Sequence, residues 1–285
     1  MTPPSLPTPL VSPEQLRAAI AAGAAPLIVD CSFDLADAAA GERAFEQGHL
    51  PGAIYAHLDR DLAGAKTGRN GRHPLPARAD WAVTLARLGV TPERAVVVYD
   101  AQGGMYAARA WWMLSWAGHR AASVLDGGVG AWTASGGALE AGAVAPAAAA
   151  ASPYPLGDSL VATIDADALQ KSLGRVMLLD ARAGERYRGE TEPLDKRAGH
   201  IPGARSRFFK DNLDAHGRFR PAAELRAAFT AFGAAPAQVV HQCGSGVTAC
   251  HNLLAMEVAG LAGSTLYPGS WSEWSSDPAR PVAVG

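Results

Sequence analysis

Short apolar runs separated by polar and glycine-rich stretches form the main pattern along the chain. Two of these runs end in an aspartate: LIV at 27–29 precedes Asp30, and MLL at 177–179 precedes Asp180. Aliphatic runs of this kind with a polar loop after them are typical of buried strands. We therefore expect strands near 27–29, 95–99, 176–179 and 238–241. Helices are predicted near 13–22, 78–88, 106–116, 222–232 and 248–259.

The two halves of the chain share the same phrases in the same order. GHLPGA at 48–53 returns as GHIPGA at 199–204. A constant shift of 142 residues then aligns the following pairs without a gap: Val98 and Val240, Gly104 and Gly246, Gly118 and Gly260, Gly127 and Gly269, Trp132 and Trp274. Each copy has the order strand, Gly-rich loop, helix, strand, which is a βαβ unit. The pattern predicts an α/β fold in two tandem domains, each a parallel sheet flanked by helices.

The repeat also predicts where the domains begin and end. An Ala- and Pro-rich stretch of low complexity, without apolar periodicity, lies between the two copies. We expect a first domain over 8–140, a linker over 141–158 and a second domain over 159–285. A chain of 285 residues with 48% hydrophobic composition can fill two cores of ordinary size.

Composition and charge narrow the class of partner. The formal net charge is -2, with 27 acidic and 25 basic residues, so no chain-wide positive field favours nucleic acid or an anionic membrane. The first residues lack the basic and apolar regions of a signal peptide, and no segment has the apolar length of a membrane span. We expect a cytoplasmic location and a small-molecule or protein partner.

The three cysteines do not form the pattern of a disulfide framework or a structural zinc site. Cys31, Cys243 and Cys250 are an odd set without a Cys-x-x-Cys pair. Cys250 follows Cys243 by about two helical turns and is expected to pack inside a helix, and Cys31 directly follows the first strand. Cys243 is therefore the candidate functional thiol, and no metal or organic cofactor is implied.

Cys243 lies in the loop CGSGVTA, between a predicted strand and a predicted helix. Open α/β sheets bind ligands at the carboxyl ends of their strands. Gly244 and Gly246 allow several N–H groups to converge on one anion, the helix N-terminus adds positive potential, and the hydroxyls of Ser245 and Thr248 add donors. This anion would be the thiolate or its persulfide, Cys–S–S⁻. The alternative is an inert buried cysteine beside a tight turn.

Two further observations refine this hypothesis. The shift of 142 places Ala101 at the position of Cys243, so the first copy has no nucleophile there. A cysteine phosphatase would need an arginine six residues after its nucleophile to bind phosphate, and that residue is Ala249. Phosphoryl transfer is therefore not expected.

With these motifs in place, the chain resembles tandem rhodanese-domain sulfurtransferases over essentially its whole length. The resemblance rests on CGSGVTA, on the paired GH(L/I)PGA phrases, and on LDGG at 125–128 with Trp132. It implies that the first domain is a rhodanese-like domain without the catalytic cysteine and that the second is the catalytic one. The neutral Gly-Ser-Gly loop is similar to that of 3-mercaptopyruvate sulfurtransferases, whereas thiosulfate enzymes often have Arg-Lys-Gly after the cysteine. A cationic loop suits the thiosulfate dianion.

The resemblance also implies roles for single residues. The proton relay of the mercaptopyruvate enzymes matches Ser245, His73 and Asp59, and the family's carboxylate-binding arginine matches Arg186. The substrate-binding loop residues are implied to be Gly244, Gly246, Val247 and Thr248. The chain departs from the pattern after Glu192-Pro193, where Leu194 replaces a second arginine; Lys196 or Arg197 is the available substitute.

The function implied is transfer of sulfur from 3-mercaptopyruvate through a Cys243 persulfide to a thiol or cyanide, with release of pyruvate. Reduced thioredoxin is the protein acceptor that the resemblance suggests. Two alternatives stay open: a thiosulfate:cyanide sulfurtransferase that uses the same cysteine, and a noncatalytic persulfide carrier or adaptor.

Overall fold

The computed structural model describes residues 6–144 and 152–285, which form two compact units. The first unit contains the described residues up to Leu62, then Pro76–Leu160 and the short Ala215–Arg218. The second contains Ala63–Leu75, Val161–Asp214 and Phe219–Gly285. The segment 63–75 therefore packs with the second unit although it lies in the first half of the sequence.

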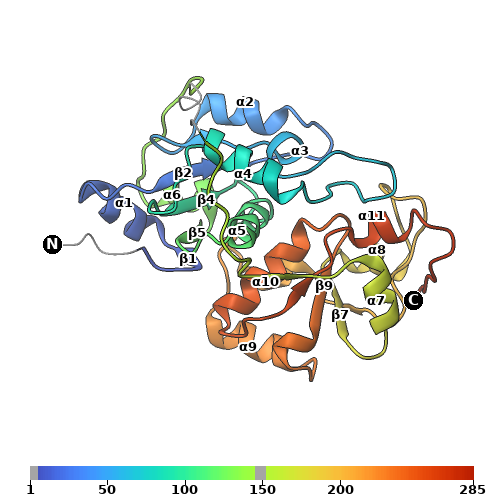
Figure 1. Cartoon of the computed structure of the whole chain (residues 1–285). Helices are drawn as coiled ribbons and strands as arrows, with labels where there is room; N and C mark the ends of the chain where they lie inside the picture. The colour runs from blue at the N-terminus through green and yellow to red at the C-terminus, as the bar shows by residue number, and fades with distance from the viewer. Residues whose placement is uncertain (1–5, 145–151) are drawn as a thin grey trace. The chain divides into compact units, whose positions relative to one another are not determined.

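The first unit is built on a five-stranded parallel sheet (Figure 1). Its strand order is β1 (Leu10–Val11), β5 (Ala122–Leu125), β4 (Val96–Tyr99), β2 (Leu27–Asp30), β3 (Ile54–Tyr55). The helices are α1 (Pro13–Ala21), α2 (Ala40–Gln47), α3 (Leu58–Asp61), α4 (Arg78–Arg87), α5 (Ala107–Trp116) and α6 (Gly128–Ala134). The start of α1 follows from its sequence, because Ser12 and Gln15 form a reciprocal capping box and Pro13 occupies the first turn.

The second unit repeats this arrangement. Its parallel sheet has the order β6 (Ala162–Thr163), β10 (Thr265–Leu266), β9 (Val239–Gln242), β7 (Met177–Asp180), β8 (Arg205–Ser206). The α-helices are α7 (Ala166–Ser172), α8 (Gly184–Arg188), α9 (Ala222–Thr230), α10 (Thr248–Val258) and α11 (Ser270–Trp274), with 3-10 turns at Phe209–Asn212 and Pro236–Gln238. The predicted α/β fold, with two parallel sheets flanked by helices, is confirmed.

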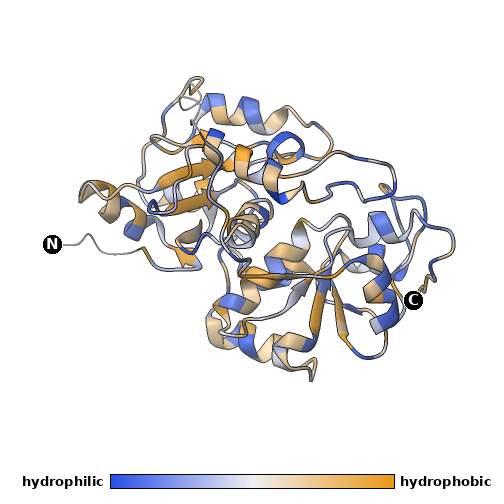
Figure 2. Cartoon of the chain, in the orientation of Figure 1, coloured by the Kyte–Doolittle hydropathy of each residue, from blue (hydrophilic) through white to orange (hydrophobic). Residues whose placement is uncertain are grey.

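The central strands are buried and begin with apolar residues, and Figure 2 shows hydrophobic colour along them. Side chains from strands and flanking helices form a core cluster in each unit; Val97, Leu125 and Trp132 belong to the first. Burial of such side chains is the main stabilising contribution, at roughly 25 cal/mol per Å² of apolar surface. No helix in the described part of the chain combines the length and apolarity needed to cross a bilayer.

The histidines of the repeated GH(L/I)PGA phrases make the same contacts in both units. His49 stacks on Phe45, with 4.0 Å between ring centroids, and its Nδ1 lies 2.7 Å from the Phe45 carbonyl oxygen. His200 stacks on Tyr187 at the same distance, and its Nδ1 lies 2.8 Å from the Tyr187 carbonyl oxygen. Each histidine thus ties a turn to the preceding helix.

The predicted linker over 141–158 has no helix or strand among its described residues, 141–144 and 152–158. Its remaining residues, 145–151, lie outside the part of the chain that the structure describes.

In the first unit, the carboxylate of Asp100 occupies the loop between β4 and α5. Asp100, at the end of β4, is fully buried. Its Oδ1 accepts the N–H groups of Gln102 and Gly104, both at 2.8 Å. Its Oδ2 accepts those of Tyr106 at 2.7 Å and Ala107 at 2.9 Å. A carboxylate with this many short N–H donors fixes the loop and the first turn of α5.

We predict that Asp100→Ala lowers the free energy of unfolding by about 3 kcal/mol, because it leaves buried N–H groups without an acceptor. Asp100→Asn should cost less, since its single amide oxygen still accepts part of the set. Urea unfolding followed by circular dichroism measures both changes. Exposed Asp158→Ala is the control, and an Asp100→Ala variant as stable as this control would contradict the proposed role of the carboxylate.

Candidate active site

Cys243 lies directly after β9 and five residues before α10, as the sequence predicts. The loop is held from the side of α11: the Cys243 N–H donates to Ser270 Oγ at 3.1 Å, and the N–H of Trp271 donates to the Cys243 carbonyl at 3.0 Å. Gly246 has a left-handed backbone with φ +77°, and a Cβ at this position would lie 2.2 Å from the Pro268 carbonyl oxygen. Only glycine fits here, so the loop conformation depends on it.

The Cys243 sulfur is buried and faces backbone donors. The residue is 2% exposed, and the Gly246 N–H donates to Sγ at 3.1 Å. Among the described residues, no acceptor receives a hydrogen bond from the N–H groups of Gly244, Ser245, Val247 or Thr248. These N–H groups before and at the start of α10 are therefore available to a bound group near the sulfur. This arrangement favours an anion.

The corresponding loop of the first unit differs in the two residues that follow its strand. The shift of 142 pairs Asp100 with Gln242 and Ala101 with Cys243. Gln242 is fully buried, but it is neutral, and neither atom of its amide group has a hydrogen-bond partner among the described residues. The second loop therefore lacks the carboxylate that occupies the first loop, and it has a sulfur instead.

His73 and Ser245 lie together in the second unit. His73 Nδ1 is 2.8 Å from Ser245 Oγ, and both side chains are buried. The segment that carries His73 is anchored next to the site, because the Arg72 N–H donates to Ser272 Oγ at 2.9 Å. A hydroxyl and an imidazole at this distance can pass a proton between them. Two of the three expected relay residues are therefore within hydrogen-bond reach.

Asp59, the third expected relay residue, is the second residue of α3 in the first unit. Its N–H donates to His57 Nδ1 at 3.1 Å. His57, the residue before this short helix, caps it, which explains how the local sequence fixes the Asp59 backbone.

Arg186, the expected carboxylate-binding residue, is on α8 and faces the thiol loop. A Cβ at Gly244 would lie 3.5 Å from its Nη1. Its Nη2 is held by Glu192 Oε1 at 2.7 Å and by Asp195 Oδ2 at 3.3 Å. Burial raises the pKa of Asp195 above its ordinary value, and neighbouring arginines partly offset this effect.

Sequence reasoning did not single out Arg72, whose Nη2 lies 3.1 Å from that same Cβ position at Gly244. Its Nη1 pairs with Asp195 Oδ1 at 2.7 Å. One sequence signal pointed to Arg72, because it directly precedes His73 in the RHPLP phrase at 72–76. Its ion-pair partner Asp195, however, is 123 residues away in sequence.

Arg197 does not take the place of the arginine that Leu194 replaces. Its guanidinium donates to backbone carbonyls of a single segment: those of Trp274, Ser275, Asp277 and Arg280. Arg197 therefore fixes the chain after α11. Leu194 and Lys196 line a cavity of about 280 Å³ that Arg72 also borders.

The other two cysteines are buried, as expected for packing residues. Cys250 Sγ lies 3.3 Å from the Gly246 carbonyl, inside α10. Burial raises the pKa of the Cys31 thiol well above its ordinary range, which keeps the thiol protonated. No group of three or more His, Cys, Asp or Glu side chains suited to a metal ion occurs in the described part of the chain.

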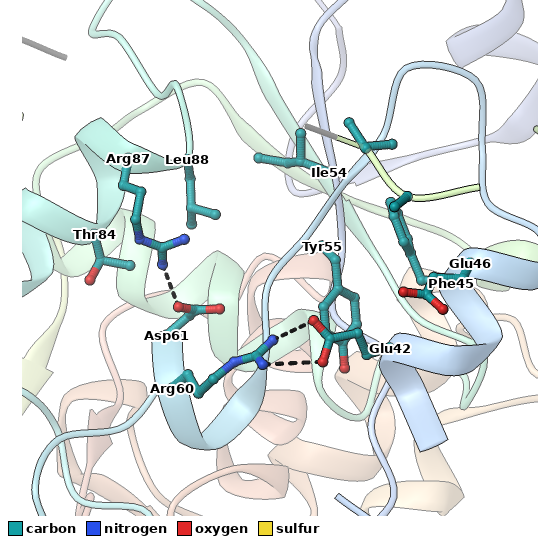
Figure 3. A pocket seen from close by; sticks show the side chains of 12 residues that line it. Glu42, Phe45, Glu46, Ile54, Tyr55, Arg60, Asp61, Thr84, Arg87 and Leu88 are labelled. Carbon is teal, nitrogen blue, oxygen red and sulfur yellow. Dashed lines mark hydrogen bonds and ion pairs between the residues drawn. The ribbon is translucent and has the colours of Figure 1, made fainter. Parts of the chain in front are cut away.

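The first unit contains a cavity of about 430 Å³ (Figure 3). Arg60 donates two hydrogen bonds to the Glu42 carboxylate, and Arg87 pairs with Asp61. Figure 3 shows both guanidinium groups facing their carboxylates. The two arginines that line this cavity are thus neutralised by its own acidic side chains.

The model of the rhodanese-like domain matches the chain twice, over residues 12–135 and 165–277. The chain belongs to the rhodanese-like domain family. These two matches agree with the internal repeat and with the two parallel sheets, so the resemblance seen in the sequence is confirmed.

Full-length relatives of this rhodanese-like chain carry sulfurtransferase names. A "Probable 3-mercaptopyruvate sulfurtransferase" of Pseudomonas aeruginosa is 48% identical over 265 residues, which cover 91% of this chain and 92% of the relative. A Mycobacterium tuberculosis protein provisionally named thiosulfate sulfurtransferase SseB is 41% identical, with 97% of both chains covered. The structure of 3-mercaptopyruvate sulfurtransferase from Leishmania major has a TM-score of 0.84 and 29% identity, covering 95% of this chain and 75% of that one.

His241, two residues before the thiol, is a buried residue of β9 with a strongly shifted pKa. Burial lowers the pKa of its imidazole from 6.5 to about 3. Its Nε2 lies 3.1 Å from Met256 Sδ, and its Nδ1 has no partner among the described residues. The histidine is therefore neutral in the folded protein at ordinary pH.

This shift predicts a loss of stability in acid. The unfolded chain takes up a proton on this histidine at a higher pH than the folded chain, so the free energy of unfolding should fall as pH drops from 6.5 toward about 3. His241→Leu should weaken this pH dependence. Urea unfolding at several pH values measures the slopes, and equal slopes for wild type and His241→Leu would contradict the prediction.

Proposed function

We propose that this chain is a sulfurtransferase that takes sulfur from 3-mercaptopyruvate, holds it as a persulfide on Cys243 and passes it to a thiol or cyanide. The observation that carries the proposal is the buried Cys243 sulfur, which accepts the Gly246 N–H at 3.1 Å in a loop where the N–H groups of Gly244, Ser245, Val247 and Thr248 have no acceptor among the described residues. Such donors stabilise a terminal persulfide anion in the way that an oxyanion hole stabilises developing charge. The names of the relatives from Pseudomonas aeruginosa and Leishmania major support this donor.

In the first half-reaction the Cys243 thiolate attacks the substrate sulfur. The carbon–sulfur bond of 3-mercaptopyruvate breaks, and its electron pair stays on the carbon as the enolate of pyruvate. The proton of the substrate thiol is delivered to this enolate, so pyruvate leaves and the enzyme keeps one sulfur atom as Cys–S–S⁻. In the second half-reaction an acceptor thiolate or cyanide attacks the outer sulfur and restores the Cys243 thiolate.

Ser245 and His73 have the geometry for the proton transfer, because their Oγ and Nδ1 atoms are 2.8 Å apart. Asp59 is the proposed third member of the relay, an assignment that rests on the family resemblance. Arg186 is proposed to bind the substrate carboxylate. The loop residues Gly244, Gly246, Val247 and Thr248 are proposed to bind substrate and persulfide.

Residues 159–285 would then form the catalytic domain, on which the segment Ala63–Leu75 packs. The linker over 141–158 joins it to a domain over 8–140 that has no cysteine at the loop position. The proposed location is the cytoplasm, where cysteines stay reduced. Reduced thioredoxin is a suitable protein acceptor, since it supplies a nucleophilic thiolate.

Thiosulfate is the alternative donor, because the relative from Mycobacterium tuberculosis is provisionally named for it. The loop argues for mercaptopyruvate, since Gly244, Ser245 and Gly246 add no positive charge for a dianion. A carrier without catalytic turnover is the other alternative.

The central prediction is that Cys243→Ser abolishes sulfur transfer. Incubation of the wild type with 3-mercaptopyruvate, followed by intact mass spectrometry, should show a gain of one sulfur atom, and Cys243→Ser should show none. Cys31→Ala, which changes a buried thiol of the first unit, is the control and should retain the gain. Persulfide formation or turnover by Cys243→Ser would refute the role of Cys243.

A second prediction separates the two donors. The wild type should have a higher kcat/KM for 3-mercaptopyruvate than for thiosulfate. Ser245→Ala and His73→Gln should lower kcat with 3-mercaptopyruvate by about 100-fold, because this donor must move a proton in the reaction. Turnover of thiosulfate, which has no thiol proton to move, should fall much less. A wild-type preference for thiosulfate, or equal losses with both donors, would count against the mercaptopyruvate assignment.

A further inference from the structure

Arg72 presents one edge of its guanidinium to the space above Gly244. Its Nη1 is held by Asp195 at 2.7 Å, which fixes the plane of the group. Its Nε is buried and has no partner, and its Nη2 makes no hydrogen bond to another described residue. Nε and Nη2 form the edge of an arginine that binds a carboxylate with two parallel hydrogen bonds. The open edge of Arg72 is thus the one suited to a carboxylate.

Arg186 borders the same space from α8. Nη2 of Arg72 lies 3.1 Å and Nη1 of Arg186 lies 3.5 Å from the point where a Cβ at Gly244 would be. Nε of Arg186 is also buried without a partner in the described part of the chain. Because residue 244 is glycine, no side chain fills the space between the two guanidinium groups and the thiol loop.

Asp195 holds both arginines at once. One of its oxygens pairs with Arg72 at 2.7 Å and the other with Arg186 at 3.3 Å. Asp195 is largely buried, with 6% of its side chain exposed. A bridging carboxylate offsets the repulsion between two neighbouring cations and orients both of them. The arginines can therefore stay close together before any substrate is bound.

We propose that Arg72 and Arg186 together bind the carboxylate of the keto-acid sulfur donor, with Arg72 as the second cation that Leu194 does not supply. The inference rests on the proposed function and extends it to specificity. Arg197 is not available for this role, because its guanidinium is bound to the carbonyls after α11. Arg72 reaches the donor site from the segment Ala63–Leu75, which also carries His73.

The test compares 3-mercaptopyruvate with its methyl ester, which keeps the thiol and ketone but has no negative charge. Arg72→Gln should lower kcat/KM for the acid by about 10- to 100-fold, the loss expected for a charged hydrogen-bonded pair. It should change kcat/KM for the ester by less than about twofold. Arg72→Lys should give an intermediate loss, because lysine keeps the charge without the two-donor edge. Arg69→Gln, an exposed arginine of the same segment, is the matched control.

Turnover of the ester also shows whether a variant has a general folding defect. An Arg72→Gln protein that loses acid and ester turnover equally has a general defect, and this result would overturn the proposal. Unchanged turnover of the acid would overturn it as well.

A binding experiment tests the carboxylate site without relying on sulfur transfer. Calorimetry measures the binding of pyruvate to the Cys243→Ser variant. Adding Arg72→Gln should weaken pyruvate binding, and adding Arg69→Gln should not. If the wild type turns over neither donor but pyruvate binding depends on Arg72, the proposed function fails and the carboxylate site stands. Pyruvate binding that does not depend on Arg72 would overturn the site.

Discussion

The backbone N–H groups of a strand-to-helix loop and of the helix start need an acceptor, and the two units meet this requirement in different ways. In the first unit the carboxylate of Asp100 satisfies four of them from inside the fold. In the second unit the residue at the same position is the neutral Gln242, and the N–H groups of Gly244, Ser245, Val247 and Thr248 have no acceptor among the described residues. The same kind of loop is therefore closed by its own carboxylate in one unit, and in the other it keeps donors that suit the proposed anion site.

A segment from the first half of the chain packs beside the loop that carries Cys243. Ala63–Leu75 belongs to the second unit and supplies both His73 and Arg72. His73 contacts Ser245, and Arg72 shares Asp195 with Arg186. In the proposed mechanism, proton transfer and binding of the substrate carboxylate are assigned to these two adjacent residues, on a segment that the Arg72 N–H anchors to Ser272 Oγ.

Much of the fold could be predicted from sequence, because the central strands are continuous apolar runs and the repeat shows their order twice. The edge strands were missed, since strands of two residues such as β3 and β8 are too short to show a period. The inner strands β5 and β10 were not placed either. Cys243 could be found from its loop alone. The place of Arg72 could not, because it depends on Asp195 and Gly244, which are more than a hundred residues away in sequence. Asp100 is visible in the sequence, but its bonds to the loop require the folded backbone.

The carboxylate inside the first loop also bears on the history of the duplication. Replacing Ala101 with cysteine would place a thiol after β4, but the N–H donors that a persulfide needs would still be bound to Asp100. Removing Asp100 alone would cost stability. Under the proposed function, a second sulfur-carrying loop therefore requires both changes together, since neither change alone supplies a thiol and open donors at once.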